Sequence, residues 1–168
     1  MKRLIYILPI LVALITSCNS TGSKPNSISR LLPEQDIIER LKYQKGIIDT
    51  LFNQSKDRLI VMVKLVDKND LVIVSNGNFP KNVELTFNIL KDSLGQIITI
   101  LEFPFCESGD WNIILTHYFD KDGNTFAFER QTNFFNSLCT DDVAYETKTE
   151  FYNADFQLID NEYKLVDK

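Results

Sequence analysis

The sequence has few of the residues on which the commonest catalytic and metal sites depend. Its 168 residues include a single histidine, His117, and three cysteines. A zinc site or proton relay built on two histidines is therefore excluded, and a serine or cysteine hydrolase would have to rest on this one imidazole. Since no Gly-x-Ser-x-Gly elbow accompanies it, we expect no catalytic residue of these classes and no metal site.

Glycine is also scarce, and acidic residues outnumber basic ones. The six glycines form no phosphate-binding loop, and no alternation of strands and helices surrounds them, which argues against a nucleotide-binding α/β fold and predicts no cofactor. The chain has 18 basic and 23 acidic side chains, a formal charge of −5, and no basic cluster. Because phosphate binding rests on clustered lysine and arginine, we expect no nucleic-acid partner.

The N-terminal residues have the three parts of a secretory signal. Lys2 and Arg3 form a basic start, residues 4–15 form an apolar run, and small residues precede Cys18. The run is too short for a transmembrane helix, which needs roughly twenty residues, and Pro9 interrupts it. This pattern predicts a signal peptide over residues 1–17.

The end of this segment, Leu14-Ile15-Thr16-Ser17-Cys18, resembles the lipobox of bacterial lipoproteins, although Ile15 stands where the family usually has leucine. In that family, signal peptidase II cuts before the cysteine and the thiol becomes lipid-modified. The resemblance covers residues 1–18 only. It implies that Cys18 is a lipid attachment site, that a membrane is a partner, and that the domain lies in the bacterial cell envelope outside the cytoplasm. The alternative is an ordinary secretory signal followed by a chance cysteine.

Residues 18–30 are rich in serine, asparagine, glycine and proline, a composition that predicts a flexible, lipidated tether. Removing residues 1–17 takes away two basic and no acidic side chains, which changes the formal charge from −5 to −7. The remaining residues, 31–168, have the size of a single domain with one core.

The pattern from Pro33 to Gln54 predicts one long N-terminal amphipathic helix. Proline suits a first helical position and acids follow it, as the helix dipole favours. Apolar residues then recur on one side of a helical projection, namely Ile37, Ile38, Leu41, Ile48, Leu51 and Phe52. We expect this helix to cover one face of a sheet.

From Leu59 onward the hydrophobic period becomes two, which is typical of strands. Turns are indicated at Lys68-Asn69, Ser93 to Gly95, Asp122-Gly123 and Asp160-Asn161. The predicted fold is therefore α+β, with the helix packed on an antiparallel β-meander of about eight strands. We expect the last strand to lie at an edge of the sheet.

Within the segment from Tyr118 to Phe128, Asp120, Asp122 and Asn124 resemble the start of a calcium loop, but Gly123 is fourth counting from Asp120, whereas an EF-hand has glycine sixth. A hairpin with Asp122 and Gly123 as a two-residue turn explains the segment better. That turn places Phe119 opposite Phe126, His117 opposite Phe128 and Leu115 opposite Arg130. The same register puts His117 on an apolar face, so we expect a packed histidine.

Cys106 and Cys139 remain once Cys18 carries lipid. Exported proteins meet oxidising conditions in which paired thiols become joined, so we expect a disulfide between these two residues. The positions 106 and 139 also fit the register of the predicted hairpin, if that ladder continued unbroken. The alternative is two separate buried thiols.

Aromatic residues concentrate in the second half of the chain. Most of them suit a core beneath the helix, but Phe134 and Phe135 fall in a segment that reads as a loop and are candidates for ligand or partner binding.

No further motif identifies a domain family. The sequence favours a lipid-anchored, non-catalytic domain that binds an unknown protein or small molecule. One alternative is a hydrolase of an envelope glycan that uses two carboxylates, and another is a purely structural envelope protein.

Overall fold

The computed structural model describes residues 34–106, 108–135 and 143–167. These residues form a helix, α1 (Glu34–Gln54), a short 3-10 helix, η1 (Lys56–Arg58), and eight strands. The strands are β1 (Ile60–Leu65), β2 (Leu71–Ile73), β3 (Val83–Lys91), β4 (Ile97–Pro104), β5 (Trp111–Phe119), β6 (Thr125–Phe134), β7 (Ala144–Tyr152) and β8 (Leu158–Asp167). The N-terminal apolar run, Cys18 and Cys139 lie outside the described residues.

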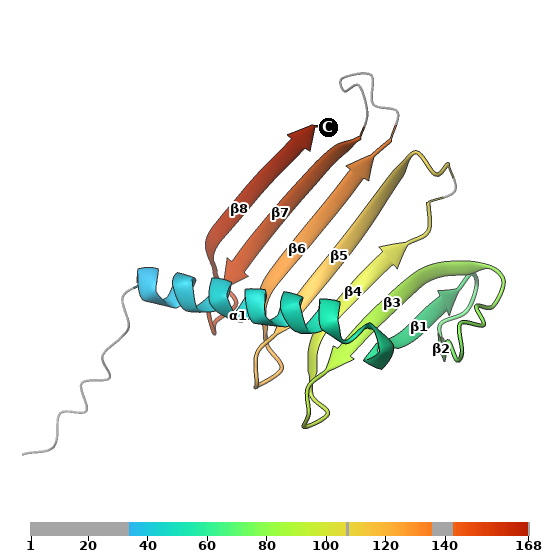
Figure 1. Cartoon of the computed structure of the whole chain (residues 1–168), viewed down its shortest axis with the longest axis horizontal. Coiled ribbons are helices and arrows are strands. Elements are labelled where there is room, and N and C mark those ends of the chain that lie inside the picture. The colour runs from blue at the N-terminus through green and yellow to red at the C-terminus, as the bar shows by residue number, and fades with distance from the viewer. Residues whose placement is uncertain (1–33, 107, 136–142, 168) are drawn as a thin grey trace, which may run out of the picture. The chain divides into compact units, whose positions relative to one another are not determined.

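All eight strands belong to one sheet, and every neighbouring pair is antiparallel. The order is β2-β1-β3-β4-β5-β6-β7-β8, so β3 to β8 form a meander and β1 lies between β2 and β3 (Figure 1). The predicted α+β class and antiparallel meander are confirmed. β8 lies at one edge of the sheet, as expected for the last strand.

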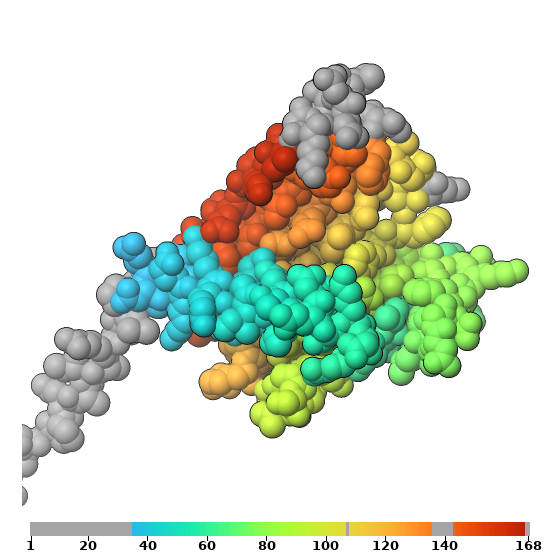
Figure 2. All heavy atoms as spheres, in the orientation of Figure 1, coloured from blue at the N-terminus to red at the C-terminus, as the bar shows by residue number. Residues whose placement is uncertain are grey.

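Helix α1 crosses one face of the sheet, which we call the helix face (Figures 1 and 2). Leu41 and Ile48 are buried in a core cluster that includes Tyr118 and Phe151. Full burial of two such side chains contributes about 3–6 kcal/mol.

Other apolar side chains of α1 point away from the sheet. Tyr43, Ile47 and Leu51 are 72%, 44% and 40% exposed, respectively. The sequence pattern predicts that Leu51 faces the sheet, but its side chain is exposed. Fewer residues of α1 therefore contact the sheet than the pattern predicts. Among the described residues, no helix is both long and apolar enough to cross a membrane.

The opposite face of the sheet, which we call the open face, carries no helix of the part that the structure describes. Side chains alternate between the two faces along each strand. Tyr118 therefore lies on the helix face and His117 on the open face. The open face of β6 and β7 carries ion pairs between Arg130 and Glu146 at 2.8 Å and between Lys148 and Glu150 at 2.6 Å.

The predicted register of the β5–β6 hairpin is confirmed over most of its length. His117 lies opposite Phe128, and Leu115 lies opposite Arg130. The prediction for Phe119 is wrong, because a register shift after Tyr118 places Phe119 opposite Thr125.

The turn of this hairpin is five residues long, from Asp120 to Asn124, and not the predicted two. Asp120 Oδ1 accepts the backbone N–H groups of both Asp122 and Asn124, each at 2.9 Å. This side chain therefore begins the turn two residues earlier than the Asp-Gly signal suggests.

The turn predicted at Asp160-Asn161 is also wrong, because both residues belong to β8. The chain reverses at Asn153 to Gln157 instead. Asn153 Oδ1 accepts the backbone N–H groups of Asp155 at 3.0 Å and Gln157 at 2.9 Å. The side chain of the first residue thus stabilises this turn, as the side chain of Asp120 does in the β5–β6 hairpin.

Candidate functional site

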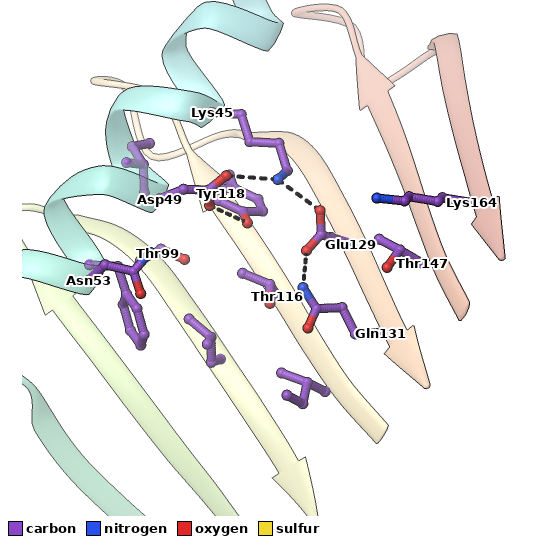
Figure 3. A pocket seen from close by; sticks show the side chains of 14 residues that line it. Lys45, Asp49, Asn53, Thr99, Thr116, Tyr118, Glu129, Gln131, Thr147 and Lys164 are labelled. Carbon is purple, nitrogen blue, oxygen red and sulfur yellow. Dashed lines mark hydrogen bonds and ion pairs between the residues drawn. The ribbon is translucent and has the colours of Figure 1, made fainter. Parts of the chain in front are cut away.

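A groove with a volume of about 520 Å³ lies between α1 and the helix face of the sheet. Figure 3 shows its side chains, which come from α1 and from strands β4 to β8. Small-ligand sites commonly measure roughly 300–1,000 Å³. The groove therefore has the size of a small-molecule site.

The deepest polar contacts of the groove centre on Lys45 of α1. Its ammonium nitrogen lies 2.9 Å from Asp49 Oδ2 and 2.7 Å from Glu129 Oε2, and it stands 4.8 Å from the centre of the Tyr118 ring. Burial is the largest single influence and lowers the pKa of Lys45, but the hydrogen bonds and charges of Glu129 and Asp49 together raise this pKa above its usual value. Lys45 is therefore held as a cation.

Tyr118 of β5 links the same network to the sheet. Its hydroxyl donates a hydrogen bond of 2.7 Å to Asp49 Oδ1. Burial, followed by the charges of Glu129 and Asp49, raises the pKa of Tyr118 far above its usual value. The phenol consequently stays protonated and acts as a donor.

Glu129 of β6 accepts two further hydrogen bonds. Gln131 Nε2 donates to Oε1 at 2.7 Å, and Thr149 Oγ1 donates to Oε2 at 3.0 Å. Within the described residues, no buried side-chain nitrogen or oxygen lacks a partner. The network thus joins α1 to β5, β6 and β7 with its carboxylates fixed in place.

Further polar side chains line the groove beside this network. They are Asn53 of α1, Thr147 of β7 and Lys164 of β8, together with Gln131. Lys164 is exposed, points toward the groove in Figure 3, and makes no ion pair with any residue that the structure describes. Hydroxyl, amide and ammonium groups in this arrangement can hydrogen-bond a small polar ligand.

The sequence-predicted binding residues lie elsewhere. Phe134 ends β6 and does not lie in a loop, while Phe135 follows it and donates its N–H to the carbonyl oxygen of Asp110 at 2.8 Å. Their side chains are 43% and 38% exposed. Phe135 lines a separate cleft of about 390 Å³ together with Trp111 and Cys106.

Cys106 has no disulfide partner among the described residues, and Cys139 is not one of them. The Cys106 sulfur lies 3.4 Å from Ser108 Oγ. This hydrogen bond, followed in effect by those of nearby backbone N–H groups, lowers the pKa of the thiol despite an opposing contribution from burial. The Cys106–Cys139 disulfide and the lipid on Cys18 stay predictions.

His117 is packed on the open face, as predicted. Its ring stacks with Phe119 at 6.4 Å and meets Phe128 at 4.8 Å between centroids. Its Nε2 lies 3.5 Å from Glu102 Oε1. Since the groove lies on the other face, His117 takes no part in it.

Sequence reasoning missed the groove residues, although two signals point to them. Lys45 and Asp49 lie on α1 close to Leu41 and Ile48, the residues that face the sheet. Along β6, polar Glu129 shares the helix face with Ala127, where a simple core would be apolar. Polar residues on both the helix and the sheet, at the same interface, indicate a polar site in place of a simple apolar core.

Comparison with protein-family models, with curated proteins and with solved structures finds no match to this chain. Its function is therefore inferred from the groove and from the N-terminal sequence.

Proposed function

We propose that this chain is a lipid-anchored protein of the bacterial cell envelope whose folded domain binds a small polar ligand without catalysis. The groove between α1 and the sheet supports the binding part of this proposal, because it combines a small-molecule volume with polar lining side chains and a hydrogen-bonded network around Lys45. The likeness of residues 14–18 to a lipobox supports the anchor.

The contacts of the two acidic groups favour binding over catalysis. A general acid must hold a proton, and a catalytic carboxylate must reach the substrate. Asp49 and Glu129 instead both bind the Lys45 ammonium, at 2.9 and 2.7 Å, and both also accept hydrogen bonds from other side chains. Both acids are therefore engaged in holding the helix on the sheet.

A carboxylate-based hydrolase is the second candidate, because Asp49 and Glu129 line one groove. Cell-wall glycan incubated with the protein, with release of reducing ends as the readout, tests it. Activity in wild type that is lost in Glu129→Gln, with the fold retained, would establish the hydrolase and overturn the non-catalytic proposal.

The binding proposal is tested with a panel of free amino acids, short peptides and sugars, detected by saturation-transfer NMR on the full chain in detergent micelles. Thr147→Trp places an indole in the groove, and Thr50→Trp makes the same change on an exposed turn of α1 outside it. We expect Thr147→Trp to weaken the binding of the bound class by about tenfold or more.

Thr50→Trp should bind the same probe as well as wild type does. Circular dichroism melts identify any variant that fails to fold. The proposal is wrong if no probe binds at millimolar concentration, or if the bound probe is held equally well by Thr147→Trp. A purely structural protein would give the first of these results.

A further inference from the structure

The outer edge of β8 is a long strand edge that no described strand covers. β8 has ten residues and pairs only with β7, whereas β2 at the opposite edge has three residues. An unpaired edge offers free backbone N–H and C=O groups to any strand that can align with it. Leu158, Tyr163 and Leu165 on this edge are 52%, 61% and 60% exposed, so apolar side chains accompany the open backbone.

The side chains of β8 divide between the two faces in a defined order. Lys42 of α1 binds Asp160 at 2.9 Å and Glu162 at 2.7 Å, which places both acids on the helix face together with Lys164. Tyr163 lies on the open face, where its hydroxyl donates to Glu146 at 3.3 Å. The helix face of this edge therefore reads acid, acid, base along the strand.

We propose that β8 pairs in antiparallel fashion with β8 of a second copy of this chain, with Tyr163 opposite Tyr163 on the two-fold axis. In this register Lys164 of each copy stands opposite Glu162 of the other, which gives two symmetric pairs of opposite charge. Opposite charges at facing positions stabilise a strand pair. Almost the full length of β8 is aligned in this register.

The neighbouring registers are less favourable. Directly opposed residues in an antiparallel pair share a face. The register can therefore change only by shifting one strand two residues at a time, which keeps helix-face residues opposite one another. One step in one direction places Glu162 opposite Glu162 at the axis, even though Lys164 then faces Asp160. One step in the other direction places Lys164 opposite Lys164. Like charges directly opposite each other destabilise a strand pair, so the charge pattern of β8 favours the register with Tyr163 on the axis.

An edge lysine commonly discourages strand pairing, but here an acid of the second copy offsets it. The two-fold axis runs perpendicular to the sheet, so α1 of both copies lies on the same face. Because Lys164 also lines the groove, Glu162 of the second copy then stands at the rim of that groove. The inference depends on neither the lipid anchor nor the identity of a ligand.

Cysteine cross-linking of the purified full chain in detergent tests the register. Residue 163 opposes itself at a Cα distance of about 4.5–5.5 Å, within disulfide range. We expect Tyr163→Cys to form a covalent dimer on oxidation. The amount of this dimer should be well above that of wild type, which measures the background from the native cysteines. Leu165→Cys is the matched control, because Leu165 is equally exposed but its two copies would lie ~13 Å apart along the strands.

Equal cross-linking of the two variants would indicate random collision and overturn the proposal, as would a Tyr163→Cys variant that folds but does not cross-link.

Sedimentation gives a second test. Lys164→Glu places a second carboxylate opposite Glu162, and we expect the dimer dissociation constant to rise about tenfold or more. Lys121→Glu makes the same charge change on a side chain that is 84% exposed in a hairpin turn, and it should leave the constant unchanged. A monomeric wild type, or equal constants for both variants, contradicts the inference.

Discussion

At the scale of single residues, the four groups Lys45, Asp49, Tyr118 and Glu129 depend on one another. The Lys45 and Glu129 side chains are only 15% and 8% exposed, so neither charge is well solvated. Removing one partner of such a buried pair leaves the other charge uncompensated, at a cost of roughly 3–5 kcal/mol. The network of these four residues is therefore a stabilising element as well as part of a candidate site.

Tyr118 makes the stability of the protein sensitive to alkaline pH. Burial, together with the charges of Glu129 and Asp49, raises the pKa of Tyr118 in the folded state, so the unfolded chain ionises first, near its usual pKa of ~10. Above that pH the folded state binds more protons than the unfolded state. The contribution of Tyr118 is thus complete below about pH 10 and is lost as the pH rises further.

Tyr118→Phe should accordingly show a shallower loss of unfolding free energy than wild type between about pH 9 and pH 11, measured by urea titration. At neutral pH the variant should lose about 1 kcal/mol with the hydrogen bond to Asp49. Tyr43→Phe is the control, because Tyr43 is 72% exposed and should leave the pH dependence unchanged. An equally steep alkaline loss in Tyr118→Phe would contradict this assignment.

Cys106 gives a second prediction at this scale. The described β5–β6 ladder ends at the pair Trp111–Phe134, so Cys106 lies beyond it and the observed register does not test its pairing with Cys139. The pairing rests on export and on the number of cysteines. Thiol titration of denatured, unreduced mature protein should find no free thiol from these residues, and reduction should release two. Two free thiols before reduction would leave separate cysteines as the explanation.

The residues of the groove could not be predicted from sequence patterns. Lys45 and Asp49 read as an ordinary i,i+4 pair on a solvated helix side, and their role depends on Glu129, which is distant in sequence. The sequence does predict the environment of His117, because two neighbouring strands with a strong turn signal set its register. Local pairing is readable in this way, whereas contacts between a helix and a sheet are not.

At the scale of elements, three hairpins share one turn design. In each, the side chain of the first residue accepts two backbone N–H groups, and the fourth residue has positive φ. The first residues are Asp92, Asp120 and Asn153, and the fourth residues are Gly95 (φ 83°), Gly123 (φ 82°) and Phe156 (φ 58°). Phe156 offsets its conformational cost by stacking on Tyr152 at 4.6 Å.

This design explains which turns the sequence predicts. Glycine marks the β3–β4 and β5–β6 turns, where it relieves the cost of positive φ. The β7–β8 turn has Phe156 at the equivalent position, so the usual signal is missing and Asp160-Asn161, inside β8, resembles a turn more closely. The side chain at the first position is the signal that all three turns share.

Two glycine substitutions should have effects of opposite sign. An added Cβ meets nothing within 4 Å at Gly123 or at Gly46, so only backbone conformation differs between them. Gly123→Ala forces alanine into positive φ and should lower the unfolding free energy by about 1–2 kcal/mol. Gly46→Ala, in the middle of α1, should raise it by about 0.5–1 kcal/mol. Thermal and urea unfolding measure both, and a change of the same sign in the two variants would refute this explanation.

At the scale of the whole molecule, the alternating pattern predicts an antiparallel sheet but not its full order. β1 pairs with β3 although β2 separates them in the sequence, so this pairing joins segments with no single turn between them. The same pattern cannot tell which face of the sheet receives α1, because apolar residues occur on both faces. The open face and the helix face are therefore distinguished only by the folded structure.

The charge of the whole domain bears on how it would be held at a membrane. Removal of the predicted signal peptide would leave a formal charge of −7, and membrane surfaces that expose anionic lipids would repel such a chain. A single acyl chain binds only marginally, whereas several chains on one cysteine anchor a protein stably, at about 0.8 kcal/mol per buried methylene. Membrane attachment should therefore depend entirely on the lipid that we propose on Cys18.

Cys18→Ser should abolish that attachment, because serine cannot carry the thioether-linked lipid and the precursor would be either left uncut or released. Phase separation of a detergent extract should find wild type in the detergent phase, and mass spectrometry of the N-terminal peptide should show the added acyl mass. Cys106→Ser removes a thiol elsewhere in the chain and should still partition with the detergent. If wild type enters the aqueous phase without an acyl mass, the N-terminal segment is an ordinary secretory signal and Cys18 is not an anchor.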